Sequence, residues 1–314
     1  MPVALATRAY GGPEHYAIIN IPTRTPDAHE VVIAVKASGA NPVDLKVAAG
    51  SLGTDPADLP FRFGYEAAGV ITAMGAEDLI GADGVPLETG QAVVAFRIVG
   101  AHASEVTVPA KDVLQKPASL SFESAAGLLL AATTAIDALD QIALGAGETV
   151  LVHGGGGSVG LATIQLARSR GASVVATAGA DRHAQLRALG ATPVEYGPGL
   201  LERVAAITPR ADAAVDTIGS QEAGLVSVAL VAEPARLVTI TRQPDILAAG
   251  GTHVGGTMER SKALRDAARA ELLAAAAVGE LSVPVVAAYP AAEARAAFEL
   301  LAGGHAGGKI VLLW

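Results

Sequence analysis

Four consecutive glycines, Gly154–Gly157, stand between an apolar run (TVLVH) and an amphipathic run that begins at Ser158. They could form a tight strand-to-helix turn, or a loop kept free of side chains so that a phosphate can approach the backbone. Gly155, Gly157 and Gly160 match G-x-G-x-x-G, which a run of glycines fulfils easily by accident. The context favours the phosphate loop, because an apolar strand precedes the motif, a helix follows it, and a second strand comes about a dozen residues later.

In a dinucleotide site of this kind, each part of the loop has a separate task. Gly155 makes the tight turn, Gly157 lets the backbone approach the pyrophosphate, and Gly160 lets the helix pack closely. The backbone N–H groups around Ser158 and Val159, together with the helix dipole, then face the anion. We therefore expect a dinucleotide at this loop.

The residue that ends the second strand indicates which dinucleotide binds. An acid there accepts from the ribose 2′-OH of NAD, but by spacing the position is Ala178. Arg182 and His183 follow closely and could balance the charge of a 2′-phosphate, which favours NADPH over NADH. Two alternatives stay open: Asp181 could bond a ribose hydroxyl, or it could cap a helix while Arg182 and His183 face solvent.

The glycine motif lies in a segment where strands and helices alternate. We expect strands at 149–153, 173–178, 193–196, 211–216, 236–240 and 251–256, and helices at 158–170, 182–189, 199–207, 220–231 and 259–278. This alternation predicts parallel strands with helical crossovers, and six strands are typical of a Rossmann sheet. Before it, residues 122–144 have the length and spacing of one helix.

The chain before residue 120 has short Val- and Ile-rich runs separated by Gly, Pro and Asp, which is typical of a small β-barrel. This pattern returns after residue 280 (LSVPVV, then GKIVLLW), around a helix expected at 291–302. We therefore expect an α/β protein. Its β-barrel domain would comprise residues 1–120, completed by 281–314, and its six-stranded parallel Rossmann domain residues 121–280.

Composition limits the partners and the location. The net charge of -9 and the scattered Lys and Arg residues argue against nucleic acid or an anionic membrane as the main partner. No apolar run approaches the ~20 residues of a membrane span, and the N-terminus lacks the apolar core of a signal peptide. We therefore expect a cytoplasmic protein.

The chain has no cysteine, which removes disulfides and thiolate metal ligands. The seven histidines show no short paired spacing, so we expect no metal site; they are His15, His29, His102, His153, His183, His253 and His305. His153 ends an apolar run and is expected in the core.

Several segments in a fixed order carry a family resemblance. They are SGANPVDLKVAAG (38–50), GYEAAGVITAMG (64–75), LLLAATTAIDAL (128–139), GETVLVHGGGGSVGLATIQLAR (147–168), AVDTIG (214–219) and GHAGGKIVLL (304–313). On these, the chain resembles the zinc-independent quinone oxidoreductases of the zeta-crystallin type, within the medium-chain dehydrogenase/reductase superfamily. The resemblance implies a GroES-like barrel as the catalytic domain beside the nucleotide-binding domain, and commonly a homodimer joined at sheet edges, with 252–258 as the candidate contact.

The resemblance also implies site residues. Asn41 and Thr134 would lie near the nicotinamide, and Gly157, Ser158 and Val159 would lie at the pyrophosphate. Arg182, His183 and Tyr196 would surround the 2′-phosphate. Gly308 and Lys309 would reach the cofactor from the C-terminal end. Two departures leave the acceptor pocket open: Lys46-Val47-Ala48 replaces a region that often holds a tyrosine, and Gly307 replaces an arginine.

Zinc-using relatives carry cysteine at Ser38 and histidine at Tyr65, so a zinc ion would lack both ligands. Without that Lewis acid, hydride transfer suits an acceptor that is already electron-poor. Asn41 could donate to its carbonyl or orient the nicotinamide ribose. Tyr65 could donate to an enolate or only fill the zinc space, and Lys46 could donate or simply be exposed. Asp44 and Glu66 are expected to be structural.

The expected function is therefore NADPH-dependent reduction of quinones or α,β-unsaturated carbonyls. One alternative is an enoyl-thioester reductase of a lipid or polyketide pathway. The other is a non-catalytic NADPH-binding sensor or structural protein, which the missing pocket tyrosine favours.

Overall fold

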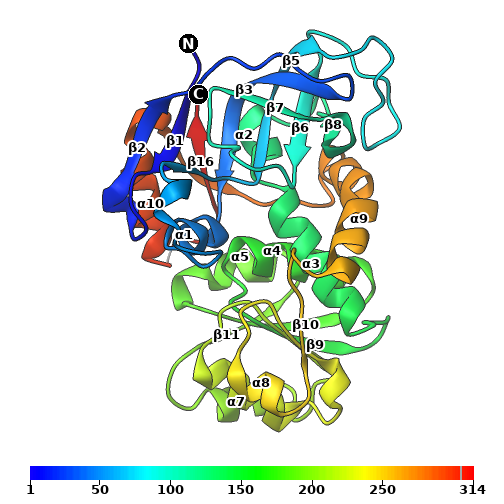
Figure 1. Cartoon of the computed structure of the whole chain (residues 1–314). Helices are drawn as coiled ribbons and strands as arrows, with labels where there is room; N and C mark the ends of the chain where they lie inside the picture. The colour runs from blue at the N-terminus through cyan, green and yellow to red at the C-terminus, as the bar shows by residue number, and fades with distance from the viewer. Residues whose placement is uncertain (305) are drawn as a thin grey trace. The chain divides into compact units, whose positions relative to one another are not determined.

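The structure is a computed structural model that describes residues 1–304 and 306–314 (Figure 1), so His305 lies outside the described residues. By its internal contacts the chain divides into two units. Unit 1 comprises Met1–Leu130, Leu273–Gly279 and Val283–Trp314, and unit 2 comprises Ala131–Leu272 and Glu280–Ser282. No helix in the described ranges is long and apolar enough to cross a membrane.

Unit 2 contains a six-stranded sheet whose neighbouring strands are all parallel. Its strands are β9 (Thr149–His153), β10 (Ser173–Ala178), β11 (Thr192–Glu195), β12 (Ala213–Asp216), β13 (Leu237–Thr239) and β14 (Thr252–His253). They lie in the order β11-β10-β9-β12-β13-β14. Counted along the chain this is the 3-2-1-4-5-6 order of a Rossmann sheet, so the predicted fold class is confirmed. The order reverses between β9 and β12, where such sheets bind ligands beyond their carboxyl ends.

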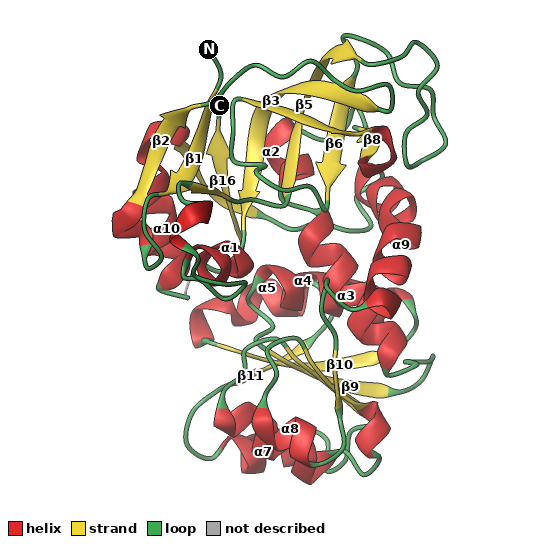
Figure 2. Cartoon of the chain, in the orientation of Figure 1, coloured by secondary structure: helices red, strands yellow, loops and turns green. Residues whose placement is uncertain are grey.

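Helices cover both faces of this sheet, as Figure 2 shows. They are α3 (Leu129–Gln141), α4 (Ser158–Ser169), α5 (His183–Ala188), α6 (Leu200–Ala205), α7 (Gln221–Leu230) and α8 (Pro244–Ala248). The same part of the chain contains α9 (Glu259–Ala277) and the 3-10 turns η4 (Ala180–Arg182) and η5 (Pro234–Arg236). Because the sheet is covered twice, its strands are apolar at nearly every position rather than at alternate ones.

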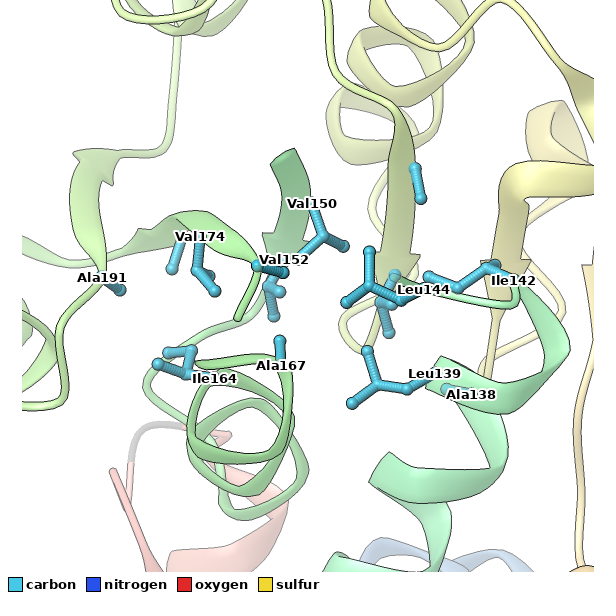
Figure 3. Packing of buried hydrophobic residues seen from close by; sticks show 14 of the residues in the cluster. Ala138, Leu139, Ile142, Leu144, Val150, Val152, Ile164, Ala167, Val174 and Ala191 are labelled. Atoms are coloured by element: carbon cyan, nitrogen blue, oxygen red, sulfur yellow. The ribbon is translucent and has the colours of Figure 1, made fainter. Parts of the chain in front are cut away.

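The core of unit 2 follows from the alternation of side chains along each strand. Val152 points to the side of the sheet where it joins Leu139 of α3 and Ile164 of α4 in one buried cluster (Figure 3). Its neighbour Leu151 points to the opposite side, where it packs in a second cluster with Val226 of α7. The crossover helices are thereby attached to the sheet on both faces.

Unit 1 is built mainly from two sheets. The first holds β1 (Val3–Thr7), β2 (Tyr16–Asn20) and β4 (Phe61–Arg62); the second holds β3 (Glu30–Ala40), β5 (Glu66–Met74), β6 (Ala92–Phe96), β7 (Glu105–Pro109), β8 (Val113–Gln115), β15 (Val285–Pro290) and β16 (Lys309–Leu313). Its helices are α1 (Pro42–Ala48), α2 (Phe122–Ala126) and α10 (Ala294–Ala302), with 3-10 turns η1 (Pro13–His15), η2 (Pro56–Asp58), η3 (Ala110–Asp112) and η6 (Ala291–Glu293). The C-terminal strand β16 pairs antiparallel with β3, placing Ile310 opposite Ala40.

Most elements expected in unit 2 lie within two residues of the observed bounds, but two expectations differ and two helices were not expected. The single helix expected over 122–144 is interrupted between α2 and α3, at Gly127 and Leu128. The strand expected over 251–256 ends at His253, because Gly255 and Gly256 turn the chain toward α9. Helices α1 and α8 were not anticipated; they begin at Pro42 and Pro244, and the fixed φ of proline suits a first helical position.

Candidate functional site

The glycine loop joins β9 to α4 at the carboxyl edge of the sheet. Gly154 has a φ of +77°, so the left-handed turn lies there rather than at Gly155. A Cβ on Gly160 would lie 2.7 Å from the Gly155 Cα and would overlap the Gly154 carbonyl oxygen. Only glycine permits this close approach of helix and loop. The sequence missed Gly154 because a run of glycines carries no mark of register.

The same loop leaves an open cradle at the start of α4. Gly157 is the N-cap residue and no side chain in the described ranges caps this twelve-residue helix, which begins at Ser158 and Val159. A Cβ on Gly157 would meet only the Gly154 oxygen, at 3.5 Å, whereas one on Gly156 would lie 3.2 Å from Arg182 Cγ. Uncapped N–H groups beside an arginine side chain fit the phosphates of a dinucleotide.

The residues expected at the 2′-phosphate gather beyond the ends of β10 and β11. Ala178 ends β10 and is buried, and His183 Nε2 lies 3.4 Å from its carbonyl oxygen. Tyr196 is half-exposed, and a Cβ on Gly179 would lie 3.8 Å from its hydroxyl.

Arg182 Nε lies 3.1 Å from Asp181 Oδ2. Asp181 caps neither η4 nor α5, so its carboxylate meets the arginine instead. This ion pair lies at the surface and is weak enough for a phosphate to compete with it.

Asp216 lies in the segment 214–219, for which no role was expected, and it organises the loop after β12. Its fully buried carboxylate accepts from the backbone N–H groups of Ile218 (3.1 Å) and Gly219 (2.8 Å). It also accepts from the Thr239 and Thr241 hydroxyls, both at 2.7 Å. Four donors around one buried carboxylate hold the edge of the sheet rigidly where the strand order reverses.

His153 lies beside this carboxylate in the core. Burial lowers the pKa of His153 to about 4, although the negative charge of Asp216 acts in the opposite direction. The imidazole is therefore neutral near pH 7, and its Nδ1 lies 3.2 Å from the Thr177 hydroxyl.

In unit 1 both amide hydrogens of Asn41 have partners, and its oxygen has one. Nδ2 donates to the Gly39 carbonyl (2.9 Å) and to Glu66 Oε1 (3.1 Å), and Oδ1 accepts from Lys309 Nζ (2.5 Å). Because an ammonium only donates, Oδ1 must face Lys309 and both amide hydrogens are already used. Of the two roles left open for Asn41, donation to a carbonyl has no free hydrogen, whereas Oδ1 can still accept.

Lys309 forms a buried ion pair with Glu66 in the same unit, with Nζ 2.5 Å from Oε1 and side-chain exposures of 2% and 0%. The second oxygen, Glu66 Oε2, accepts from the backbone N–H of Leu130 at 2.9 Å. Gly308 precedes the lysine and packs against β15, since a Cβ there would lie 2.6 Å from a methyl carbon of Val286.

The remaining candidates differ in exposure. Tyr65 is half-buried, and burial, followed by the charge of Asp44, raises the pKa of its phenol, which stays protonated near pH 7 and can donate. Lys46 is exposed in the last turn of α1. Thr134 is buried in α3 of unit 2.

The positions that hold zinc ligands in metal-using relatives carry other bonds here. Ser38 Oγ lies 2.8 Å from His102 Nδ1 and accepts from Trp314 Nε1 at 2.8 Å. Glu66 is neutralised by an ammonium that would repel a cation. Among the described residues, no group of three or more His, Cys, Asp or Glu side chains could hold a metal ion, so these side chains do not fit zinc.

The strand order and the glycine cradle of unit 2 are those of a dinucleotide-binding protein, and unit 1 is rich in β-strands. Two family models match the chain: "Alcohol dehydrogenase GroES-like domain" over residues 27–118 and "Zinc-binding dehydrogenase" over residues 189–312. The chain belongs to the medium-chain dehydrogenase/reductase superfamily. Within it, the lack of fitting zinc ligands agrees with the zinc-independent branch.

Similar proteins include the mouse "Quinone oxidoreductase", 36% identical over 186 residues (58% of this chain, 54% of the relative). The Arabidopsis thaliana "NADPH-dependent alkenal/one oxidoreductase, chloroplastic" is 33% identical over 218 residues (68% and 55%). The chain thus matches about half the length of these relatives. A solved quinone oxidoreductase from Coxiella burnetii is 26% identical with a TM-score of 0.84, covering 100% of both chains.

Proposed function

We propose that this chain reduces quinones or α,β-unsaturated carbonyls by hydride transfer from NADPH. The observation that carries the proposal is the glycine cradle, with the uncapped start of α4 and Arg182 beside it at the carboxyl edge of a Rossmann sheet. The names of the mouse and Arabidopsis relatives support the acceptor class, and the Arabidopsis name supports the cofactor.

The residues of unit 2 would hold the cofactor by its charged groups. The N–H groups at Ser158 and Val159 bind the pyrophosphate, and Gly157 leaves room for it. Arg182, with His183 and Tyr196 nearby, binds the 2′-phosphate through charge-assisted hydrogen bonds. Ala178 leaves space for the 2′-phosphate and carries no charge, whereas an acid at this position would repel the phosphate.

A second set of residues, all from unit 1 except Thr134 of unit 2, would act on the reacting half. When bound, NADPH supplies the hydride. The remaining lone pair of Asn41 Oδ1 accepts from a hydroxyl of the nicotinamide ribose, and Thr134 and Gly308 adjoin this half. The protonated phenol of Tyr65 donates to the acceptor oxygen as negative charge develops on it, with the exposed ammonium of Lys46 as the second candidate donor.

The test is NADPH oxidation, followed optically in the presence of a chelator, against a para-quinone, an ortho-quinone and a short alkenone, with NADH in parallel. We expect turnover of at least one acceptor with NADPH preferred. NADPH binding without turnover of any acceptor would contradict the proposal and favour an enoyl thioester acceptor or a non-catalytic NADPH sensor. Loss of activity in the chelator, with a stoichiometric metal, would contradict the metal-free mechanism.

A further inference from the structure

Two networks of buried polar groups meet at Asn41, and the first network holds its backbone. The Asn41 N–H donates to Asp44 Oδ2 at 2.8 Å, and the Asp44 side chain is fully buried. The same oxygen lies 3.3 Å from His102 Nε2, and the other ring nitrogen of His102 contacts Ser38. The His102 ring is itself held edge-on against Phe63, with ring centroids 5.6 Å apart. The backbone at Asn41 is therefore fixed by partners from distant parts of unit 1.

The second network of polar groups holds the side chain of Asn41. Lys309 Nζ lies 2.5 Å from both Asn41 Oδ1 and Glu66 Oε1, so one ammonium joins the amide to the carboxylate. The Asn41 Nδ2 bond to Glu66 closes a ring of three side chains. Such a ring allows one orientation of the amide, because a flipped amide would turn its donor toward the ammonium.

The backbone around this ring is shaped to admit it. A Cβ on Gly39 would lie 2.6 Å from Glu66 Oε1, and a Cβ on Gly127 would lie 2.6 Å from Lys309 Cγ. The interruption between α2 and α3 lies at Gly127 and lets the Leu130 N–H in the first turn of α3 donate to Glu66 Oε2. The interruption that the sequence did not predict thus satisfies the buried carboxylate.

Stability alone is a poor reason for this arrangement. A buried ion pair gains little over apolar residues of the same volume, because both charges lose their hydration. The ring instead gives a specific geometry to one neutral amide. We propose that Glu66 and Lys309 are positioning residues that hold Asn41 with Oδ1 as its single remaining acceptor, and that Lys309 does not itself contact the cofactor phosphates. This inference rests on the proposed function, in which that acceptor serves the nicotinamide ribose.

The test compares Lys309→Met, Glu66→Gln and the double variant with the wild-type chain. Dissociation constants are measured by fluorescence titration for NADPH and for adenosine 2′-phosphate 5′-diphosphate, a fragment that keeps the 2′-phosphate and the diphosphate but lacks the nicotinamide and its ribose. For each single variant we expect the Kd for NADPH to rise about five-fold, the effect of one lost hydrogen bond between neutral groups. The Kd for the fragment should stay within about two-fold. The double variant should resemble the single variants, because the two residues act as one device.

Glu30→Gln is the matched control. Glu30 is another buried carboxylate of unit 1 with an arginine partner, at the opposite end of β3 from Asn41, so this variant should change neither Kd. Thermal unfolding of all variants shows whether they fold. The double variant removes both buried charges together and preserves the test if a single variant does not fold.

Three outcomes would overturn the inference. If Lys309→Met weakened NADPH and the fragment equally while Glu66→Gln weakened neither, Lys309 would be a direct phosphate ligand. If the variants bound both compounds as the Glu30→Gln control does, the ring would be structural only. A wild-type chain that bound neither compound would overturn the proposed function and the inference together, which distinguishes it from the first two results.

Discussion

Arg182 is the residue on which the proposed preference for NADPH depends. Its Cβ and Cγ atoms lie beside Gly156 in the glycine loop, and its guanidinium pairs with Asp181, which is exposed. We predict that Arg182→Ala weakens the binding free energy of NADPH by about 1.5–3 kcal/mol, because a charge-assisted hydrogen bond is lost. The binding free energy of NADH should change much less. Arg187→Ala, on the exposed side of α5, is the control. Equal changes for both dinucleotides would show that Arg182 does not meet the 2′-phosphate.

Two glycines of the same loop separate stability from binding. Gly160→Ala should lower the free energy of unfolding by about 1–3 kcal/mol, because its Cβ would collide with the Gly154–Gly155 backbone. Gly157→Ala should cost less stability, since its Cβ would meet only one atom, at 3.5 Å, but should weaken NADPH binding by narrowing the cradle. Urea unfolding and dinucleotide titration measure the two effects. Equal losses of stability would contradict this packing account.

His153 should make the chain sensitive to mild acid. Its pKa is lowered to about 4 in the folded chain from the ordinary value of 6.5, so the unfolded chain takes up the proton first as the pH falls. The free energy of unfolding therefore decreases from about pH 6.5 down to about pH 4, by about 2 kcal/mol between pH 7 and pH 5. In the His153→Gln variant, this decrease in the free energy of unfolding between pH 7 and pH 5 should be absent, as measured by urea unfolding at both pH values. The same decrease in the variant as in the wild type would contradict the role given to His153.

At the scale of the elements, a buried ion pair joins α3 to α9. Arg265 Nε lies 2.9 Å from Asp137 Oδ2, with side-chain exposures of 7% and 0%. Asp137→Ala should lower the free energy of unfolding by about 3–5 kcal/mol, because the guanidinium loses this partner while it stays buried. The double variant Asp137→Leu with Arg265→Met should recover most of the lost free energy of unfolding, as measured by urea unfolding. A cost below about 1 kcal/mol for Asp137→Ala would place the pair with surface ion pairs.

The elements also show where short-range patterns fail. The apolar spacing over 122–144 is helical, and both α2 and α3 are helices as that spacing predicts. Gly127 is the C-cap of α2, and Lys309 of β16 packs against it so closely that a Cβ there would lie 2.6 Å from Lys309 Cγ. A residue 182 positions away leaves no trace in the local periodicity, so the interruption could not be predicted from the segment itself.

At the scale of the whole molecule, we propose a homodimer through the segment 252–258. Among the described strands β14 ends the sheet, pairing only with β13, and an edge strand offers unpaired backbone groups to another chain. Met258 in this segment is 41% exposed. We predict that sedimentation gives twice the 31.3 kDa chain mass and that Met258→Glu shifts it toward one chain. Ile207→Glu, next to α6 at the other side of the sheet, is the control; a wild-type monomer would contradict the proposal.

The sequence by itself determined the Rossmann unit and its glycine loop, because both depend on residues close together in the chain. Strand and helix periods, and the need for glycine where helix and loop touch, act over a few residues and are visible in the letters. Only the tertiary structure decided the left-handed turn at Gly154 and the four donors around Asp216.

The partners of Asn41 were likewise decided by tertiary structure alone. Lys309 is 268 residues from Asn41 and 243 from Glu66, and the antiparallel register of β16 on β3 brings them together. The sequence placed Asn41 and Lys309 at a site by resemblance. It could not show that they bind each other, because hydrogen-bond partners follow from the register of strands that are distant in the chain.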